Sequence, residues 1–187
     1  MYALGAETQI QRPVGPFDTY IYTAARLANI EPEIIAAHIM QESSWNPNAT
    51  HRDTDGVSSY GLIQVRLDTA RSLLGEPNLT PQMLLNPKIN ILAGAKYIQQ
   101  SRIKWPDIKD SIAAYNAGKP RKNSAGQYTN SKGVTNVQHY VDRVYGFYQT
   151  YKAGAAFKPV NFQMGSYILP GLVGILGVGL FLWKRQA

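Results

Sequence analysis

The most restrictive feature of the sequence is a run of twenty residues without a charge near its C-terminus, from Met164 to Trp183. A helix rises about 1.5 Å per residue, so this run spans the roughly 30 Å hydrocarbon core of a bilayer. Aromatic residues stand near both ends and two cations follow at once, as at the ends of membrane helices. We therefore predict one transmembrane helix at 164–183 with a basic tail at 184–187. A buried core helix is the alternative, which the glycines of the run disfavour.

The whole chain has the size of one domain with an appendage, at 187 residues. It contains no cysteine, which excludes a disulfide scaffold, a thiol nucleophile, an iron–sulfur cluster and a cysteine-bound zinc. Nineteen lysines and arginines oppose twelve carboxylates, so the net charge is +7. Such a charge favours an anionic partner: nucleic acid, a lipid surface or an acidic cell-wall polymer.

Helical spacing and helix-end residues dominate the chain between its two ends. Prolines stand at expected first turns and glycines follow expected last turns. We predict helices over 17–29, 32–43, 67–74, 87–104, 107–117 and 135–151. The first carries Ile21, Ala24 and Leu27 at helical spacing, and Thr135 with Gln138 forms a capping-box pattern before the last. Residues 50–60 are expected to form a polar loop or small hairpin, and the basic residues 119–133 a mobile loop.

These elements divide the chain into parts. Residues 1–16 are turn-rich and lack the basic start and apolar run of a signal peptide, so we expect an N-terminal arm. Residues 17–152 form the helical domain, and residues 153–163 a short linker to the predicted membrane helix. The expected fold class is mainly α, with one polar excursion after the second helix.

Glu42 is the first candidate for chemistry, because it ends an apolar helix between Met40 and Trp45. Partial desolvation there would raise its pKa and keep it protonated near neutrality, ready to act as a general acid. A solvated helix-end glutamate is the alternative that spacing alone favours. Asp53 and Asp55 follow in the polar segment, where they could supply a second carboxylate or merely cap turns.

Other classes of site find little support in the sequence. His38 and Glu42 share a helix face, but the HExxH pattern is absent, so we expect no metal. No GxSxG elbow and no phosphate-binding or dinucleotide-binding glycine pattern occurs. Nucleic-acid binding would rest on charge alone, without a known motif, so we expect no nucleic-acid partner.

Several short motifs occur in a fixed order. They are Glu42-Ser43, Tyr60-Gly61-Leu62-Ile63-Gln64-Val65, Asn86-Pro87 with Asn90, Gly94 and Tyr97, Ala114-Tyr115-Asn116-Ala117-Gly118, and Tyr140-Val141. Together, over about 17–151, they resemble the lytic transglycosylases of the soluble-lytic-transglycosylase (SLT) type, which have a goose-lysozyme-like fold. The resemblance implies a lysozyme-like catalytic domain preceding the membrane helix.

The resemblance also implies an activity. Enzymes of this family cleave peptidoglycan between N-acetylmuramic acid and N-acetylglucosamine and leave a 1,6-anhydro-muramyl end, without a cofactor. Glu42 matches their single catalytic acid and base. No carboxylate nucleophile is needed where the N-acetyl group of the substrate holds the intermediate.

The remaining motif positions match substrate-binding residues of the family. Ser43 follows the acid and can hydrogen-bond near the site. Gln64 can bind saccharide oxygens, and Ile63 replaces the methionine usual before it. Tyr115 can position Glu42 through its hydroxyl, and Asn116 can reach the substrate. Tyr140 is expected at the cleft wall. For Gly61, Gly94 and Gly118 we expect structural roles instead, in close packing and at helix ends.

The expected protein is thus a single-pass membrane protein whose catalytic domain faces peptidoglycan. We expect it on a bacteriophage virion or host cytoplasmic membrane, with other virion or envelope proteins as further partners, where it opens the wall during genome delivery. A secretion or conjugation component is the cellular alternative. A goose-type lysozyme that hydrolyses the glycan, or a non-catalytic peptidoglycan-binding membrane protein, are the other readings left open.

Overall fold

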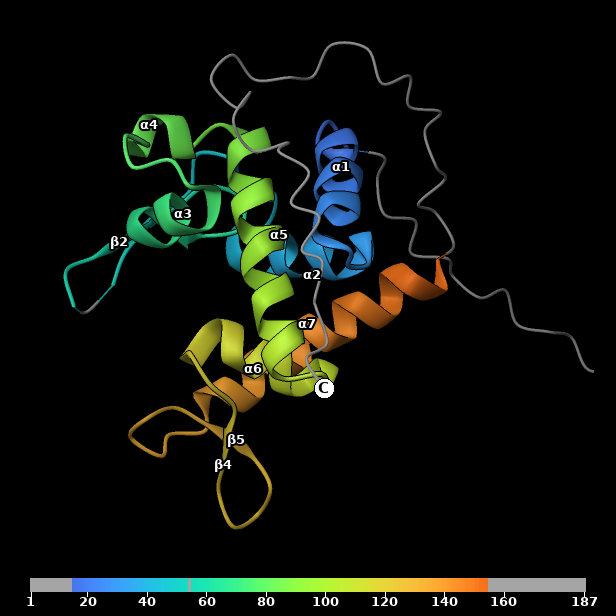
Figure 1. The fold of residues 1–187 in the computed structure, drawn as a ribbon. Coiled ribbons are helices and arrows are strands. Elements are labelled where there is room, and N and C mark those ends of the chain that lie inside the picture. Colours follow the sequence, from blue (N-terminus) through green and yellow to red (C-terminus); the bar gives the residue numbers. More distant parts are fainter. Residues whose placement is uncertain (1–14, 54, 155–187) are drawn as a thin grey trace, which may run out of the picture.

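The computed structural model describes residues 15–53 and 55–154. Its helices are α1 (Asp18–Ala28), α2 (Pro32–Ser43), α3 (Leu67–Leu74), α4 (Pro81–Leu84), α5 (Pro87–Lys104), α6 (Ile108–Ala117) and α7 (Asn136–Ala153). Its strands are β1 (Thr50–Arg52), β2 (Ser58–Tyr60), β3 (Val65–Arg66), β4 (Arg121–Lys122) and β5 (Tyr128–Thr129). The mainly helical class predicted for this part of the chain is therefore confirmed (Figure 1).

Most helix ends lie where the end signals of the sequence placed them. Asn86 accepts a hydrogen bond from the Lys88 amide at the start of α5, with proline in the first turn. Asp107 caps α6 by accepting from the Asp110 amide. That helix ends at Gly118, whose φ of 77° is left-handed.

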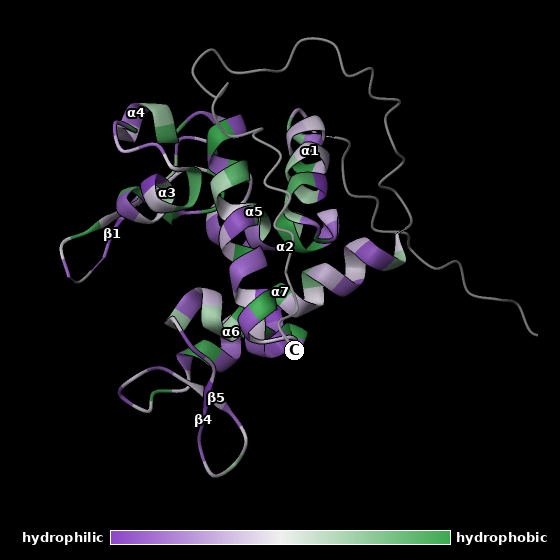
Figure 2. Ribbon diagram, viewed as in Figure 1, coloured by the Kyte–Doolittle hydropathy of each residue, from purple (hydrophilic) through white to green (hydrophobic). Residues whose placement is uncertain are grey.

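α5 runs through the middle of the described domain, where α1, α3 and α6 pack on it, while α2 packs on α7 (Figure 1). Hydrophobic residues, green in Figure 2, lie along α1, α2 and α5. On α1 the buried face contains Ile21, Ala24 and Ala28, whereas Leu27 is 57% exposed. The inward placement implied by the spacing of Leu27 is wrong, because the small side chain of Ala28 occupies the inward position beside it.

The polar segment 50–60 is a hairpin rather than a loop. β1 pairs antiparallel with β2, so that Thr50 faces Tyr60, and β3 extends the sheet with Val65 opposite Tyr60. This small sheet projects from the helical body beside α3 (Figure 1).

A second hairpin, β4–β5, occupies the segment that we expected to be a loop. The Tyr128 hydroxyl donates to Asp110 of α6 at 2.5 Å, and the Lys122 ammonium lies 2.9 Å from the same carboxylate. Tyr128 is itself buried, so the hairpin is fixed to α6. Within residues 15–53 and 55–154 there are therefore two polar excursions, where we expected one.

The capping box predicted for the last helix is wrong. Thr135 makes no side-chain capping hydrogen bond. Gln138 instead accepts from the Tyr128 amide at 2.9 Å and donates to Asp142 at 2.8 Å. The glutamine therefore links α7 to β5 instead of capping its own helix.

Within residues 15–53 and 55–154, no helix combines the length and the hydropathy that crossing a bilayer requires. The transmembrane helix predicted at 164–183 lies outside the described residues, as do most of the N-terminal arm, most of the linker and the basic tail. These parts of the domain division stay predictions.

Candidate active site

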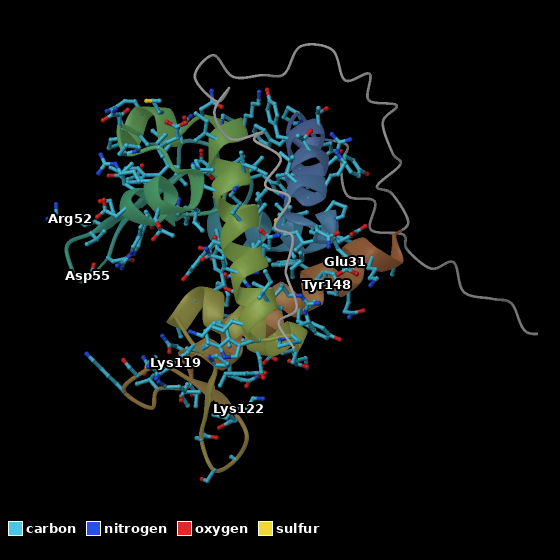
Figure 3. All side chains as sticks on the ribbon, in the orientation of Figure 1. Glu31, Arg52, Asp55, Lys119, Lys122 and Tyr148 are labelled. Atoms are coloured by element: carbon cyan, nitrogen blue, oxygen red, sulfur yellow. The ribbon has the colours of Figure 1, made fainter. Side chains whose placement is uncertain are left out.

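A cleft of about 1130 Å³ lies between the three-stranded sheet and the C-terminal end of α6. One wall comes from β1–β3 and the other from residues 115–118, with Asn130 and Asn136 beside them. Arg52 and Asp55, near the tip of the β1–β2 hairpin, and Lys119, just after α6, project to the same side of the molecule in Figure 3. Glu31 and Tyr148 lie on the opposite side.

Glu42 lines this cleft from the last turn of α2. The helix ends after it because Ser44 adopts a left-handed φ of 49°. Burial raises the pKa of Glu42 to about 7, against a lowering by the hydrogen bond from Tyr140, while the nearby charge of Asp53 adds to the rise in pKa. A carboxyl group with this pKa can both give and take a proton near neutral pH.

The two carboxyl oxygens of Glu42 have different surroundings. Oε1 accepts a hydrogen bond from the Tyr140 hydroxyl at 2.5 Å. Oε2 has no hydrogen-bond partner among the described residues, and it is not sealed from solvent, so it is the oxygen that faces the cleft. With Oε1 occupied by a donor, the proton of the neutral acid resides on Oε2.

Behind Glu42 lies His38, one turn earlier on α2. Its side chain is only 1% exposed, and its Nδ1 lies 3.0 Å from the Tyr140 oxygen. Burial lowers the pKa of His38 to about 3, so the ring is neutral near neutral pH. Tyr140 of α7 thus bridges the side chains of His38 and Glu42, which the sequence placed on one face of the same helix.

Two further side chains connect the turn of residues 61–64 to the helices around it. The Ser43 hydroxyl donates to the Leu62 carbonyl at 2.8 Å, and the Tyr115 hydroxyl donates to the Ile63 carbonyl at 2.7 Å. Both bonds tie the turn to the helices that carry Glu42 and Asn116. The Gly-Leu-Ile-Gln motif therefore holds its place beside the acid through its backbone.

Asn90 of α5 also hydrogen-bonds to the turn, and it is fully buried. Its Oδ1 accepts from the Ile63 amide at 2.9 Å, and its Nδ2 donates to the carbonyls of Tyr60 at 2.7 Å and Leu84 at 3.1 Å. Its amide is therefore fully used inside the protein. Asn90 supports the site rather than meeting substrate.

Two glycines allow this close approach. Gly61 has a left-handed φ of 75°, and a Cβ there would collide with the Asn90 side chain. A Cβ at Gly94 would collide with Ile63. The structural role in close packing predicted for both glycines is confirmed.

Gln64 lines the cleft, but its amide is already engaged. Nε2 donates to the carbonyls of Gly61 at 2.7 Å and Ala49 at 3.1 Å, and Oε1 accepts from Ser59 at 3.1 Å. The side chain thus joins the turn to the three-stranded sheet and gives the wall its shape.

The residues selected from the sequence separate into two groups. Glu42, Gln64, Tyr115 and Asn116 line the cleft, whereas Ser43 and Tyr140 are not among its lining residues. Asn116 is exposed and its side chain has no hydrogen-bond partner among the described residues, so its amide is available.

The two tyrosines have roles different from those expected. Tyr140 lies behind Glu42 and binds its carboxylate, instead of forming the cleft wall. Tyr115, expected to hold Glu42 through its hydroxyl, uses that hydroxyl for the Ile63 carbonyl. Tyr140, from α7, is therefore the tyrosine that holds Glu42, the role expected for Tyr115.

The two candidate aspartates of the cleft share one arginine. Arg66 donates to Asp53 Oδ2 from Nη2 at 2.6 Å and from Nε at 3.1 Å, and to Asp55 Oδ2 from Nη1 at 2.8 Å. Asp55 Oδ1 also accepts from the Val57 amide at 3.0 Å. This arginine offsets the charge of both carboxylates and fixes them to the sheet.

Several cleft residues were missed by sequence reasoning. They include Thr50, Arg52, Ser59, Thr69, Asn130 and Asn136. Asn136 is exposed, with no side-chain partner among the described residues. No local pattern marks these positions, because they come to the cleft from several separate elements: the β1–β2 hairpin, α3, the segment after β5 and the start of α7. Tyr97, one of the motif residues, packs against Tyr115 with ring centroids 4.9 Å apart and also borders the cleft.

No group of three or more side chains able to ligate a metal occurs in residues 15–53 and 55–154. The cleft instead combines Glu42 and the surrounding amides and hydroxyls with the charged groups of Arg52, Arg66, Asp53 and Asp55. Amides and hydroxyls of this kind can hydrogen-bond a hydroxyl-rich ligand.

A comparison with known families matches residues 19–138 to the transglycosylase SLT domain. The chain belongs to this family. The match ends two residues before Tyr140, so the contact of that tyrosine with Glu42 is known from the structure alone.

Two curated relatives extend the comparison. The chain is 32% identical over 103 residues to a transglycosylase of Enterobacteria phage PRD1 and 30% identical over 101 residues to the invasion protein IagB of Salmonella typhimurium. The matches cover 55% and 54% of this chain, and 35% and 63% of those proteins. The chain thus spans less than two thirds of each.

The fold also matches a solved structure. The 70 kDa soluble lytic transglycosylase of Escherichia coli superposes with a TM-score of 0.60 at 24% identity, over 73% of this chain and 24% of that one. This similarity shows the lysozyme-like fold that we predicted from the motifs.

Proposed function

We propose that the protein is a peptidoglycan lytic transglycosylase that uses Glu42 as its single acid and base. The observation that carries the proposal is the electrostatic state of the cleft. Among the cleft-lining carboxyl groups described, Glu42 alone has no cationic partner, whereas Arg66 holds Asp53 and Asp55. Burial raises the pKa of Glu42 to about 7. Membership of the SLT family supports the same activity.

The proposed reaction proceeds in two steps. In the first, Glu42 donates its proton from Oε2 to the glycosidic oxygen as the bond from that oxygen to the muramyl C1 breaks. The N-acetyl oxygen of the muramyl residue bonds to C1 and holds the intermediate. In the second, the Glu42 carboxylate takes the proton of the muramyl 6-hydroxyl, whose oxygen attacks C1 and displaces the N-acetyl oxygen. Glu42 ends protonated, a 1,6-anhydro end forms, and no water is consumed.

One residue can serve both steps because its pKa lies near the working pH. A carboxyl group with an ordinary pKa would be almost fully ionised at neutral pH and could not donate a proton. A carboxyl group with a much higher pKa would be protonated, but it would be too weak an acid. Burial of Glu42 and the hydrogen bond from Tyr140 act in opposite directions on this pKa and leave it at about 7.

Hydrolysis of the goose-lysozyme kind is the alternative mechanism. It would require Asp53 or Asp55 to orient a water molecule. Both carboxylates instead accept hydrogen bonds from Arg66, which occupies one oxygen of each and holds them to the sheet. This contact favours the transglycosylase.

The test is a digestion of purified peptidoglycan with the full chain in a nonionic detergent, beside its Glu42→Gln variant. We expect muropeptides one water lighter than hydrolytic products from the natural protein, and none from the variant. Products with reducing ends would instead identify a lysozyme. No product from a folded natural protein would leave the non-catalytic, peptidoglycan-binding reading.

We further propose that the domain is tethered to a membrane by residues 164–183 and is carried by a phage particle, where it opens the wall locally for genome delivery. The similarity to the phage PRD1 transglycosylase supports the viral setting. The similarity to the invasion protein IagB of a bacterium supports a cellular setting as the second candidate, and there we propose a secretion or conjugation component. Mass spectrometry of purified particles and of uninfected envelopes separates them: presence in the envelopes alone would exclude the viral setting.

A further inference from the structure

We propose that His38 is a positioning residue for the acid: its Nδ1–H donates to the Tyr140 oxygen and thereby directs the one hydroxyl proton of Tyr140 to Glu42. This inference deepens the proposed function and rests on it. The residues form a chain across the α2–α7 contact, in which Tyr140 stands between two side chains of the same helix face.

The hydrogen-bonded series His38–Tyr140–Glu42 has short contacts, and its first two members are almost fully buried. Nδ1 of His38 lies 3.0 Å from the Tyr140 oxygen, which lies 2.5 Å from Oε1 of Glu42. His38 is 1% exposed and Tyr140 is 7% exposed. The His38 ring also packs on Tyr115, with centroids 4.3 Å apart. Because the Tyr115 hydroxyl donates to the Ile63 carbonyl, it does not compete for this chain.

A count of protons shows why His38 matters. The Tyr140 hydroxyl has one proton to donate, while its oxygen can also accept. If Nδ1 carries a proton, it donates to that oxygen, and the tyrosine proton goes to Glu42. If Nδ1 were bare, it would attract the tyrosine proton itself, and Oε1 would lose its donor. The ionised carboxylate formed in the first step requires the first arrangement.

Neither supporting residue ionises during the reaction. Burial keeps His38 neutral, and burial together with the Glu42 charge raises the pKa of Tyr140 well above its usual range. His38 and Tyr140 therefore neither take up nor release a proton during the reaction. They act only by orienting the Tyr140 hydroxyl toward Glu42. This arrangement leaves Oε2 to carry the acid proton into the cleft.

The other charged and titratable groups near this chain are few. Asp53, from the segment between β1 and β2, acts on Glu42 through its charge. Tyr115 of α6 and Tyr97 of α5 act on Tyr140. None of them donates a hydrogen bond to Oε1 of Glu42, so the Tyr140 donor is the contact that His38 can control.

The test measures the pKa of Glu42 by NMR, with a heavy carbon isotope at the glutamate carboxyl groups of the full chain in detergent. The sequence has five glutamates, and the Glu42 signal is the one lost in Glu42→Gln. Loss of the donor in Tyr140→Phe should raise the pKa of Glu42 by about one unit, because a hydrogen bond to a charged group is lost. His38→Leu should raise it by about half as much.

Two comparisons distinguish a His38 that orients the Tyr140 hydroxyl from a His38 that only fills space in the core. If His38 acts through Tyr140, the double variant should show no larger rise than Tyr140→Phe alone. His38→Asn should restore the natural value, since its amide nitrogen lies near the place of Nδ1, whereas His38→Gln, whose amide lies near Nε2, should not. The alkaline limb of the kcat/KM profile should move with these values.

The inference is overturned if His38→Leu raises the pKa equally with and without Tyr140, or if folded His38→Asn behaves like His38→Leu. Circular dichroism establishes that each variant is folded, and the two amide variants keep the test decisive where the leucine variant fails to fold. Absence of anhydro products from the natural protein would contradict the proposed function, while the NMR result decides the role of His38 separately.

Discussion

Replacing Glu42 by glutamine should stabilise the folded protein above neutral pH and leave its stability unchanged in acid. A glutamate carboxyl has a pKa of 4.5 when unperturbed, and burial raises it to about 7 in the fold. The folded state therefore holds this proton more tightly than the unfolded state. The stabilisation that results is complete below about pH 4.5 and is lost as the pH rises through about 7.

The size of the effect follows from this difference in pKa. Each unit corresponds to about 1.4 kcal/mol, so the rise in the pKa of Glu42 corresponds to about 3 kcal/mol of lost stability at alkaline pH. Glutamine cannot ionise, and its side-chain oxygen still accepts from Tyr140. The variant should therefore avoid this loss, and its free energy of unfolding should exceed that of the natural protein by about 3 kcal/mol above neutrality.

Urea unfolding of the full chain in nonionic detergent, followed by tryptophan fluorescence at several pH values, measures this difference. Asp68→Asn is the control, because the Asp68 side chain is 89% exposed and its replacement should change stability by less than about 0.5 kcal/mol. A Glu42→Gln variant that is equally or less stable than the natural protein at about pH 8 would refute the reasoning that this carboxyl is desolvated.

Four further outcomes are expected. Asn90→Leu leaves an amide and two carbonyls unpaired and should lower the free energy of unfolding by about 3 kcal/mol or more in urea titrations. Gly94→Ala forces a methyl group against Ile63 and should cost about 1–3 kcal/mol in the same assay. Asp53→Asn should lower peptidoglycan turnover less than about tenfold, against about a hundredfold or more for Glu42→Gln; equal losses would favour hydrolysis. The kcat/KM of the natural protein should fall as the pH rises through about 7, since Glu42 must start protonated.

The helices and the acid could be predicted because their signals are local. Asn86 with Pro87, and Asp107, mark helix starts by chemistry that acts within one turn. The apolar residues next to Glu42 in the sequence made it a candidate, although spacing alone favoured a solvated glutamate at a helix end. The resemblance to a family then supplied what spacing alone left open.

The roles of the tyrosines could not be predicted, because they depend on contacts between distant segments. Tyr140 reaches Glu42 across 98 positions, and Tyr115 reaches Ile63 across 52. Both are aromatic residues with one hydroxyl, so sequence could not tell which would meet the acid. The β4–β5 hairpin was missed for a similar reason, since Asp110 fixes it from another element.

The central claim is that Glu42 gives the proton of its carboxyl to the leaving sugar and then takes another proton from the muramyl 6-hydroxyl, without water. The most direct test is digestion of peptidoglycan in water labelled with heavy oxygen, followed by mass spectrometry of the muramyl ends. The account predicts anhydro ends that carry no label. Ends that carry one labelled oxygen would contradict it, because water would then have attacked C1.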